Sequence, residues 1–151
     1  MEIQIQPMTR ALVPEVAALE RAYFSDPWSE GAFYEELDNP QARTLMALVC
    51  GEVAGFVNVR SLFGEVYINN IAVAEKFRRC RIGERLLRAM EDYVKPFAFI
   101  TLEVRKSNLP AQKLYEKLGY AVVGERKNFY SAPAENALLM TKFAPAEDAD
   151  V

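Results

Sequence analysis

Histidine is absent from this sequence of 151 residues, and cysteine occurs only twice. Without histidine, Ser-His-Asp and Cys-His catalysis, the usual histidine-containing zinc sites and an imidazole proton shuttle are all excluded. The two cysteines, Cys50 and Cys80, form neither a CxxC pair nor the four-ligand spacing of a metal site. We therefore predict no metal centre and no disulfide framework, and any catalytic proton transfer must use Glu, Asp, Tyr, Lys, Ser or Cys.

Long apolar runs and a targeting segment are also lacking. Nowhere do about 18 uninterrupted apolar residues occur, and the first residues show no positive region followed by an apolar one. We expect a cytoplasmic protein that does not enter a membrane. The content of 51% apolar and 11% aromatic residues, with a formal charge of only −3, excludes a disordered chain. It fits one domain over residues 1–143, followed by a small-residue, acidic tail over 144–151 that we expect to be flexible.

Hydrophobic periodicity predicts an α/β domain in which about four helices cover a mixed, mostly antiparallel sheet of about seven strands. Apolar residues recur at helical spacing over residues 9–24, after Ser29, after Gly83 and after Asn108. Alternating or continuous apolar runs predict strands over residues 2–6, 43–50, 53–61, 66–74, 98–104, 120–125 and 137–143. Short connections between residues 43 and 74 favour antiparallel pairing there.

Several residues mark the ends of the predicted helices. Ser29 is a typical N-cap, and Trp28 before it and Phe33 after it have the spacing of a hydrophobic staple. Asn108 opens the last helix, and Gly119 stands just past its end, where glycine is favoured. These signals fix the expected bounds of two helices.

The densest charge cluster is Lys76-Phe77-Arg78-Arg79-Cys80-Arg81, with four cations within six residues. It lies between a predicted strand and the helix after Gly83, so backbone N–H groups and the helix N-terminus would converge on one point, a geometry that binds phosphate groups. A solvated basic loop explains the charges equally well. No second basic patch accompanies this one, and we therefore expect no direct binding of nucleic acid.

The same loop resembles the pyrophosphate-binding loop of the GCN5-related N-acetyltransferase (GNAT) superfamily, which reads Gln/Arg-x-x-Gly-x-Gly/Ala. The match is Arg78-Arg79-Cys80-Arg81-Ile82-Gly83, in which Arg81 replaces the first glycine. A β-carbon resists positive φ and close approach of a ligand, which argues against the loop's usual backbone conformation. The resemblance implies that the phosphates of acetyl-CoA are held by Arg78, Arg79, Cys80, Arg81, Ile82, Gly83 and Glu84.

From about Thr9 to Met140 the chain is similar to the RimI type within that superfamily, the ribosomal-protein-alanine N-acetyltransferases. The matching segments are Pro27-Trp28-Ser29-Glu30, Asn70-Ile71-Ala72-Val73, Leu102-Glu103-Val104-Arg105, Ser107-Asn108, Leu114-Tyr115, Gly119-Tyr120 and Arg126-Lys127-Asn128-Phe129-Tyr130. Departures are Phe129 in place of a tyrosine and Asn136 in place of an aspartate, both near the expected substrate side. The resemblance implies an enzyme that transfers acetyl from acetyl-CoA directly, in a ternary complex, to the N-terminal alanine of a small-subunit ribosomal protein.

Such a reaction needs an unprotonated amine, support for the oxyanion and a proton for the leaving thiolate. Glu103 lies in an otherwise apolar strand, where partial burial would make it a stronger base, and the resemblance places the general base there. The alternative is a strand-end carboxylate that faces water. The resemblance also implies that Tyr115 protonates the coenzyme A thiolate, although beside Leu114 and Leu118 it equally fits a core residue.

The resemblance further implies several binding roles. The backbone of Ile71, Ala72 and Val73 would pair with the pantetheine arm where the sheet splays, and an N–H near Val73 would support the acetyl carbonyl. Asn108 would contact the thioester end in addition to capping its helix. The two walls of the acceptor entrance would be Trp28 and Tyr130, the latter in the loop before the final strand, and each also fits a packing role.

Two other functions remain open on the sequence. An enzyme of the same superfamily with a lysine side chain, a polyamine or another small amine as acceptor would keep the same machinery. A non-catalytic module that binds coenzyme A or nucleic acid through Arg78, Arg79 and Arg81 would need neither Glu103 nor Tyr115. The sequence carries no signal of the oligomeric state.

Overall fold

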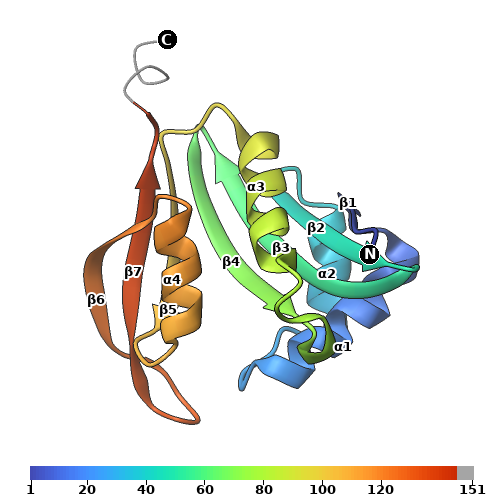
Figure 1. The fold of residues 1–151 in the computed structure, drawn as a ribbon, viewed down its shortest axis with the longest axis horizontal. Helices are drawn as coiled ribbons and strands as arrows, with labels where there is room; N and C mark the ends of the chain where they lie inside the picture. Colours follow the sequence, from blue (N-terminus) through green and yellow to red (C-terminus); the bar gives the residue numbers. More distant parts are fainter. Residues whose placement is uncertain (146–151) are drawn as a thin grey trace.

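Residues 1–145 are described by a computed structural model, and residues 146–151, which form most of the predicted tail, lie outside the described residues. The described chain forms a seven-stranded sheet with helices on both faces (Figure 1). In chain order the elements are β1 (Gln4–Pro7), the 3-10 turn η1 (Arg10–Leu12), α1 (Val13–Tyr23), α2 (Glu30–Leu37), β2 (Ala42–Val49), β3 (Glu52–Leu62), β4 (Glu65–Val73), η2 (Glu75–Phe77), α3 (Ile82–Val94), β5 (Phe99–Arg105), α4 (Leu109–Lys117), β6 (Ala121–Tyr130) and β7 (Glu135–Phe143). The predicted fold class is confirmed.

The strands follow the order β1-β2-β3-β4-β5-β7-β6 across the sheet, and every neighbouring pair is antiparallel except β4 and β5. Those two strands run parallel for only three residue pairs, from Glu65↔Phe99 to Tyr67↔Thr101. Beyond these pairs β4 continues alongside β3 and β5 alongside β7, so the two central strands diverge (Figure 1). The sheet is therefore split in its middle.

A β-bulge in β4 lies next to this divergence. Asn58 of β3 pairs with Asn70, whereas the following residue, Val59, pairs with Ile68, so Asn69 has no partner of its own. A bulge bends its strand and increases the local twist. The Asn69 side chain donates a hydrogen bond of 3.0 Å to Oδ1 of the buried Asn58. This bond fixes the bulge, and the bend contributes to turning the second half of β4 away from β5.

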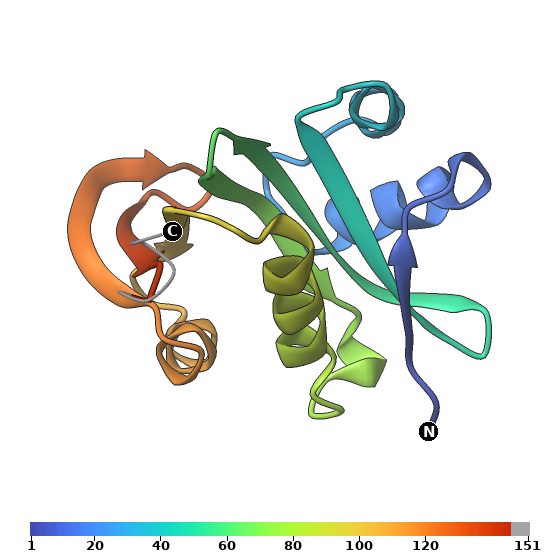
Figure 2. The same cartoon turned by 90° about the horizontal axis from the view of Figure 1, so that it is seen from above.

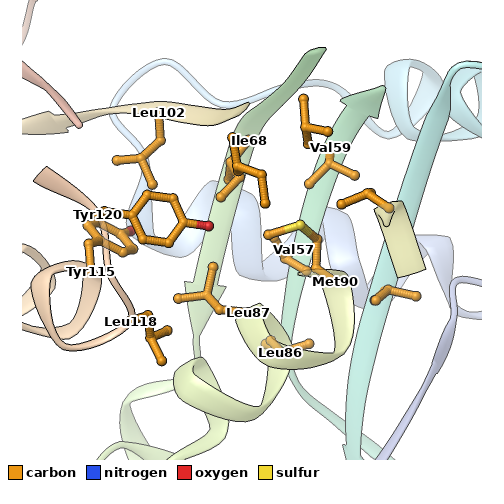
Figure 3. Packing of buried hydrophobic residues seen from close by; sticks show 14 of the residues in the cluster. Val57, Val59, Ile68, Leu86, Leu87, Met90, Leu102, Tyr115, Leu118 and Tyr120 are labelled. Atoms are coloured by element: carbon orange, nitrogen blue, oxygen red, sulfur yellow. The ribbon is translucent and has the colours of Figure 1, made fainter. Parts of the chain in front are cut away.

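The helices divide between the two faces of the sheet. Helices α3 and α4 cover one face, and α1 and α2 cover the other (Figure 2). Figure 3 shows Leu86, Leu87 and Met90 of α3 packing with Val57 and Ile68 of the central strands. Each helix thus buries an apolar stripe against the sheet, and among residues 1–145 no helix has the length and apolar character needed to cross a membrane.

Three predicted features of the helix ends are confirmed. The side chains of Ser29 and Asn108 each accept a hydrogen bond from the backbone N–H three residues later, at 3.1 and 3.3 Å, as N-caps do. The rings of Trp28 and Phe33 lie 5.5 Å apart, which is the expected staple. Gly119, just past α4, has a φ of +98°, a conformation that glycine adopts without strain.

The first helix begins later than its apolar spacing predicts. Residues Arg10–Leu12 form a 3-10 turn, and the α-helix starts only at Val13, so that Pro14 lies in its first turn. Proline has no N–H, and its ring clashes with the carbonyl group four residues earlier. An α-helix that continued from Thr9 through Pro14 would meet this clash, and the regular helix therefore begins beside the proline.

Candidate active site

A cleft of about 710 Å³ opens where β4 and β5 diverge. It is lined by these two strands, by the end of α1 and the segment after it, by the N-cap and the last turn of α4, and by the end of β6 and the segment between β6 and β7. Six residues singled out in the sequence line it: Trp28, Ile71, Glu103, Asn108, Tyr115 and Tyr130. The fold therefore gathers these six residues from separate elements around one space.

Glu103 enters the cleft from β5. Its neighbours Leu102 and Val104 are buried in the core beneath α3 and α4, and strand alternation turns Glu103 to the opposite face. Its side chain is 29% exposed, and its Oε1 lies 3.2 Å from Nε of Arg126 in β6. The carboxylate is therefore partly buried and held by a cation, unlike a freely solvated carboxylate at a strand end.

Tyr115 reaches the cleft from α4. It is 6% exposed, and its ring lies 6.0 Å from that of Tyr120 (Figure 3). Within residues 1–145 its hydroxyl has no hydrogen-bond partner. Burial, and to a lesser degree the nearby Tyr130, raises the pKa of the phenol above its ordinary value. The phenol therefore stays protonated throughout the neutral range, in a position that borders the cleft.

Tyr130 is the last residue of β6, which corrects the prediction of a loop at this position. β6 leaves its regular register before this residue and regains it where Tyr130 pairs with Glu135. Asn128, at a φ of +54°, lies in the irregular stretch. A sequence that forms such an irregular strand resembles that of a loop, which explains the wrong prediction. The Tyr130 ring lies 4.4 Å from Cζ of Arg105. Burial, followed by the charge of Glu103, raises the pKa of Tyr130 to about 12.

Trp28 lines the cleft from the segment between α1 and α2. Its ring is held by the staple contact with Phe33, and its backbone N–H donates a hydrogen bond of 3.0 Å to Glu20 Oε2. Packing and a place in the cleft wall are therefore compatible for this residue.

The basic loop after β4 lies outside the lining of the cleft. Arg81 is the N-cap of α3 and adopts φ +61° and ψ +25°, and Arg79 has a φ of +68°. The expectation that a β-carbon argues against a glycine-like backbone at Arg81 is therefore wrong. A left-handed conformation costs a residue with a β-carbon roughly 1–2 kcal/mol, which the surrounding fold offsets here.

The cations of this loop differ in how they are engaged. Lys76 forms an ion pair of 2.6 Å with a glutamate of β3, and Arg78 donates a hydrogen bond of 3.3 Å to the backbone carbonyl of Val73. Arg79 and Arg81 are exposed, and in the described part of the chain their side chains form neither an ion pair nor a hydrogen bond. Arg81 also gives α3 no side-chain cap. Exposed cations beside an uncapped helix N-terminus suit an anionic ligand.

In the rest of the loop the side chains are already engaged in packing or ion pairs, so the backbone is what remains for a ligand. Ile82 is buried in the core, and a β-carbon at Gly83 would lie 3.2 Å from a side-chain carbon of α4. Glu84 forms an ion pair of 2.6 Å with Lys117, and the hydrogen bond from that lysine lowers the pKa of Glu84. The Sγ of Cys80 lies 3.8 Å from the backbone carbonyl two residues before it.

The second half of β4 has a free edge. Past Tyr67 the edge that faces β5 has no partner strand among residues 1–145, so its backbone groups are not used by the sheet. Ile71 lines the cleft, Val73 is half-buried, and Ala72 is buried against the α1 and α2 side. This edge lies between the basic loop and the cleft.

Arg105 is a cleft residue that the sequence analysis did not single out. Its guanidinium donates hydrogen bonds to the backbone carbonyls of Pro133 at 2.9 Å and Ser131 at 3.3 Å, and it forms an ion pair of 3.2 Å with Glu135. It therefore fixes the segment between β6 and β7. The available signal was strand alternation, because a residue two positions after Glu103 shares its face.

Glu20 is a second such residue, 1% exposed and part of the cleft lining. Burial raises its pKa above the ordinary range, while hydrogen bonds from Trp28 and Asn70 act in the opposite direction. The available signal was its place in α1, because it continues the buried apolar stripe of Val13, Val16 and Ala17 at helical spacing. An acid on such a stripe needs an explanation beyond packing.

Comparisons with known proteins agree with this arrangement. The model of the acetyltransferase (GNAT) family matches residues 13–120, and the chain belongs to this family. A protein of Bacillus subtilis, whose name proposes that it is a ribosomal protein bS18-alanine N-acetyltransferase, is 37% identical over 131 residues, covering 85% of this chain and 87% of that protein. The N-alpha-acetyltransferase RimI of Mycobacterium tuberculosis is 31% identical over 146 residues, covering 93% and 92%.

Structural similarity extends over the same region. The crystal structure of the ribosomal-protein-S18-alanine N-acetyltransferase from Escherichia coli has a TM-score of 0.86 at 27% identity and covers 95% of this chain and 94% of that one. Within the family the chain is thus similar to the RimI-type enzymes. It is an acetyl-CoA-dependent N-acetyltransferase.

Proposed function

We propose that this enzyme acetylates the N-terminal α-amine of a protein and that its acceptor is the N-terminal alanine of a small-subunit ribosomal protein. The observation that carries the reaction is the presence of a carboxylate, Glu103, and a protonated phenol, Tyr115, in one cleft. The acceptor is supported by the relatives, whose names specify alanine of ribosomal protein bS18 or S18.

The donor, acetyl-CoA, supplies an activated acetyl thioester. In this proposal its pyrophosphate binds the exposed guanidinium groups of Arg79 and Arg81 and the open N–H groups at the start of α3. Its pantetheine arm pairs with the backbone of Ile71 and Val73 along the free edge of β4. Asn108, which lines the cleft at the start of α4, contacts the thioester end.

Glu103 is the general base in this proposal. An α-amino group has an ordinary pKa of about 7.7–8.0, so a modest base, acting directly or through water, supplies the neutral nucleophile near neutral pH. The ion pair with Arg126 orients the carboxylate. A lysine acceptor, with an ordinary pKa of about 10.4, would need stronger deprotonation at this position.

Tyr115 is the general acid, and transfer is direct. Its phenol gives a proton to the departing thiolate, while a backbone N–H near Val73 supports the oxyanion. An acyl-enzyme on Cys80 is disfavoured, because this residue belongs to the basic loop and does not line the cleft. Trp28 and Tyr130 border the acceptor from two segments of the cleft wall, the one between α1 and α2 and the end of β6.

Thiol release from acetyl-CoA tests the proposal. The acceptors are a short peptide with a free N-terminal alanine, the same peptide with an acetylated N-terminus, and free lysine as a competitor. We expect turnover with the free peptide alone. Turnover with the blocked peptide, or a preference for lysine, contradicts α-amine specificity, and tight coenzyme A binding without turnover on any acceptor contradicts the catalytic assignment.

A further inference from the structure

Glu20 is a buried acid in α1 without an ion-pair partner in residues 1–145. Its Oε2 accepts a hydrogen bond from the Trp28 N–H at 3.0 Å, and both of its oxygens lie 2.9 Å from Nδ2 of Asn70. Burial of a carboxylate without a counter-ion is costly unless hydrogen bonds compensate. An apolar side chain would satisfy the packing of this stripe at lower cost, so the carboxylate is explained by the groups it holds.

The two hydrogen-bond donors belong to different parts of the cleft. Trp28 lies in the wall between α1 and α2, and Phe33 holds its ring, so Glu20 and the staple fix the backbone and the ring separately. Asn70 lies in β4 directly after the bulge at Asn69, within the stretch that has a free edge. Glu20 therefore joins the wall on the acceptor side to the strand on the donor side.

We propose that Glu20 is a positioning residue for the acceptor, which sets the spacing between the Trp28 wall and β4. The inference rests on the proposed function, in which Trp28 borders the acceptor. In the proposed function Glu103 takes the substrate proton, and Glu20 acts through the two groups that donate hydrogen bonds to it. Pairing with β3 holds the backbone of β4 independently of Glu20, whereas the backbone of Trp28 depends on it. Its effect therefore lies in the KM for the acceptor peptide, whereas kcat and the KM for acetyl-CoA are unaffected.

Substitution Glu20→Gln tests this assignment with almost no change in shape. Glutamine has one acceptor oxygen, and its NH₂ group would face a donor, either the Trp28 N–H or the Asn70 amide. We expect the KM for the peptide to rise about tenfold, as for the loss of one hydrogen bond to a charged group. The kcat and the KM for acetyl-CoA should stay within about twofold of wild type.

Tryptophan fluorescence provides a readout that does not depend on turnover. Trp28 is the only tryptophan of the chain, so the emission reports on this wall alone. In Glu20→Gln we expect the emission to shift to longer wavelength and its quenching by acrylamide to increase, because either the Trp28 N–H or the Asn70 amide loses its acceptor and the wall is held less firmly to β4. Circular dichroism shows whether the variant is folded.

A double substitution restores the pattern of donors and acceptors. In Glu20→Gln with Asn70→Asp, the glutamine oxygen accepts from the Trp28 N–H and its NH₂ group donates to the new carboxylate, at unchanged net charge. We expect the KM for the peptide and the emission to return toward wild type. A failure of the double variant to recover either value relative to Glu20→Gln contradicts the proposed hydrogen-bond network.

Glu36→Gln is the matched control. Glu36 is also a buried acid on this face of the sheet, 6% exposed, but it lies in α2, pairs with Arg60 at 3.1 Å and does not line the cleft. We expect its substitution to leave the peptide KM and the Trp28 emission unchanged, whatever its effect on thermal stability. An equal rise in KM in both variants contradicts a specific role for Glu20.

The outcomes separate this inference from the proposed function. Wild-type turnover on the peptide is measured first, and its absence contradicts the proposed function. In that case the Trp28 emission of Glu20→Gln alone tests whether Glu20 anchors the Trp28 wall. A folded Glu20→Gln with wild-type peptide KM and wild-type emission overturns the inference. If Glu20→Gln does not fold, Asn70→Ala replaces it, and unchanged KM and emission in that variant overturn the inference equally.

Discussion

Replacing Tyr115 by phenylalanine removes the hydroxyl that we assign as the proton donor and little else. The ring keeps its packing 6.0 Å from Tyr120, and the hydroxyl has no partner in residues 1–145 that the change would leave unsatisfied. We expect kcat for the peptide acceptor to fall roughly 10²- to 10⁴-fold, the usual contribution of a general acid. The free energy of unfolding should fall by no more than about 0.5 kcal/mol, because the hydroxyl borders the cleft and forms no hydrogen bond within residues 1–145 that the change would break.

The pH dependence of kcat distinguishes this role further. Burial raises the pKa of the Tyr115 phenol above its ordinary value of 10.0, so the donor stays protonated up to at least that pH. Wild-type kcat should therefore show no alkaline limb between about pH 8 and 10. Thiol release at saturating acetyl-CoA and peptide measures this profile. An alkaline limb in that range that disappears in Tyr115→Phe would show that the phenol ionises there, and the reasoning would fail.

Tyr120→Phe is the control for Tyr115→Phe. Tyr120 is 2% exposed, but its hydroxyl donates a hydrogen bond of 3.0 Å to Glu91 and does not reach the cleft. Loss of this hydroxyl removes the hydrogen-bond donor of one Glu91 oxygen and should lower the free energy of unfolding by about 1–3 kcal/mol. We expect kcat to stay within about twofold of wild type. The assignment of Tyr115 is refuted if its substitution leaves kcat unchanged, or if both variants lose kcat to the same extent.

Three further predictions concern the base, the donor site and acid stability. Glu103→Gln should lower kcat roughly a hundredfold or more while the Kd for acetyl-CoA, measured by calorimetry, stays within about twofold; a parallel loss of binding would contradict a purely chemical role. Arg79→Ala should raise that Kd about tenfold at low salt and less at high salt, and an unchanged Kd at low salt would exclude a phosphate contact. The hydrogen bond from Ser107, followed by the guanidinium of Arg105, lowers the pKa of Glu135 below its ordinary 4.5. Glu135 therefore contributes its full stabilisation above pH 4.5 and loses it as the pH falls through its lowered folded-state pKa. The Tm values of wild type and Glu135→Gln should differ at pH 7, and the difference should shrink as the pH falls below 4.5; a constant difference would argue against this linkage.

Local signals explain why much of the fold was predictable from the sequence. Ser29 and Asn108 mark helix starts through hydrogen bonds to N–H groups only three residues away, and Gly119 marks a helix end through its own φ. The apolar run around Glu103 likewise marked its strand. Each of these features depends on neighbours within a few residues, and the sequence displays those neighbours directly.

The remaining features depend on contacts between distant residues. β7 pairs between β5 and β6, so the sheet order at this end differs from the chain order, and short-range patterns do not encode it. Glu20 and Asn70 are 50 positions apart, and their hydrogen bonds exist only because α1 crosses β4 in the folded protein. The left-handed backbone of Arg81 also goes against the preference of its residue type. In each case tertiary structure overrides or adds to what local propensity specifies.

The limited pairing of β4 and β5 leaves a free strand edge between the basic loop and the cleft that holds Glu103 and Tyr115. These strands are parallel, so their carboxyl ends point to the same edge of the sheet, and α3 is the crossover between them. The basic loop follows the end of β4, and Glu103 lies near the end of β5. Because the strands stop pairing at Tyr67, an unpaired backbone edge runs from the cleft toward the loop. A full β4–β5 ladder would close the cleft and occupy these backbone groups, so the split in the sheet is what would let one ligand reach both the proposed phosphate site and the proposed base, Glu103.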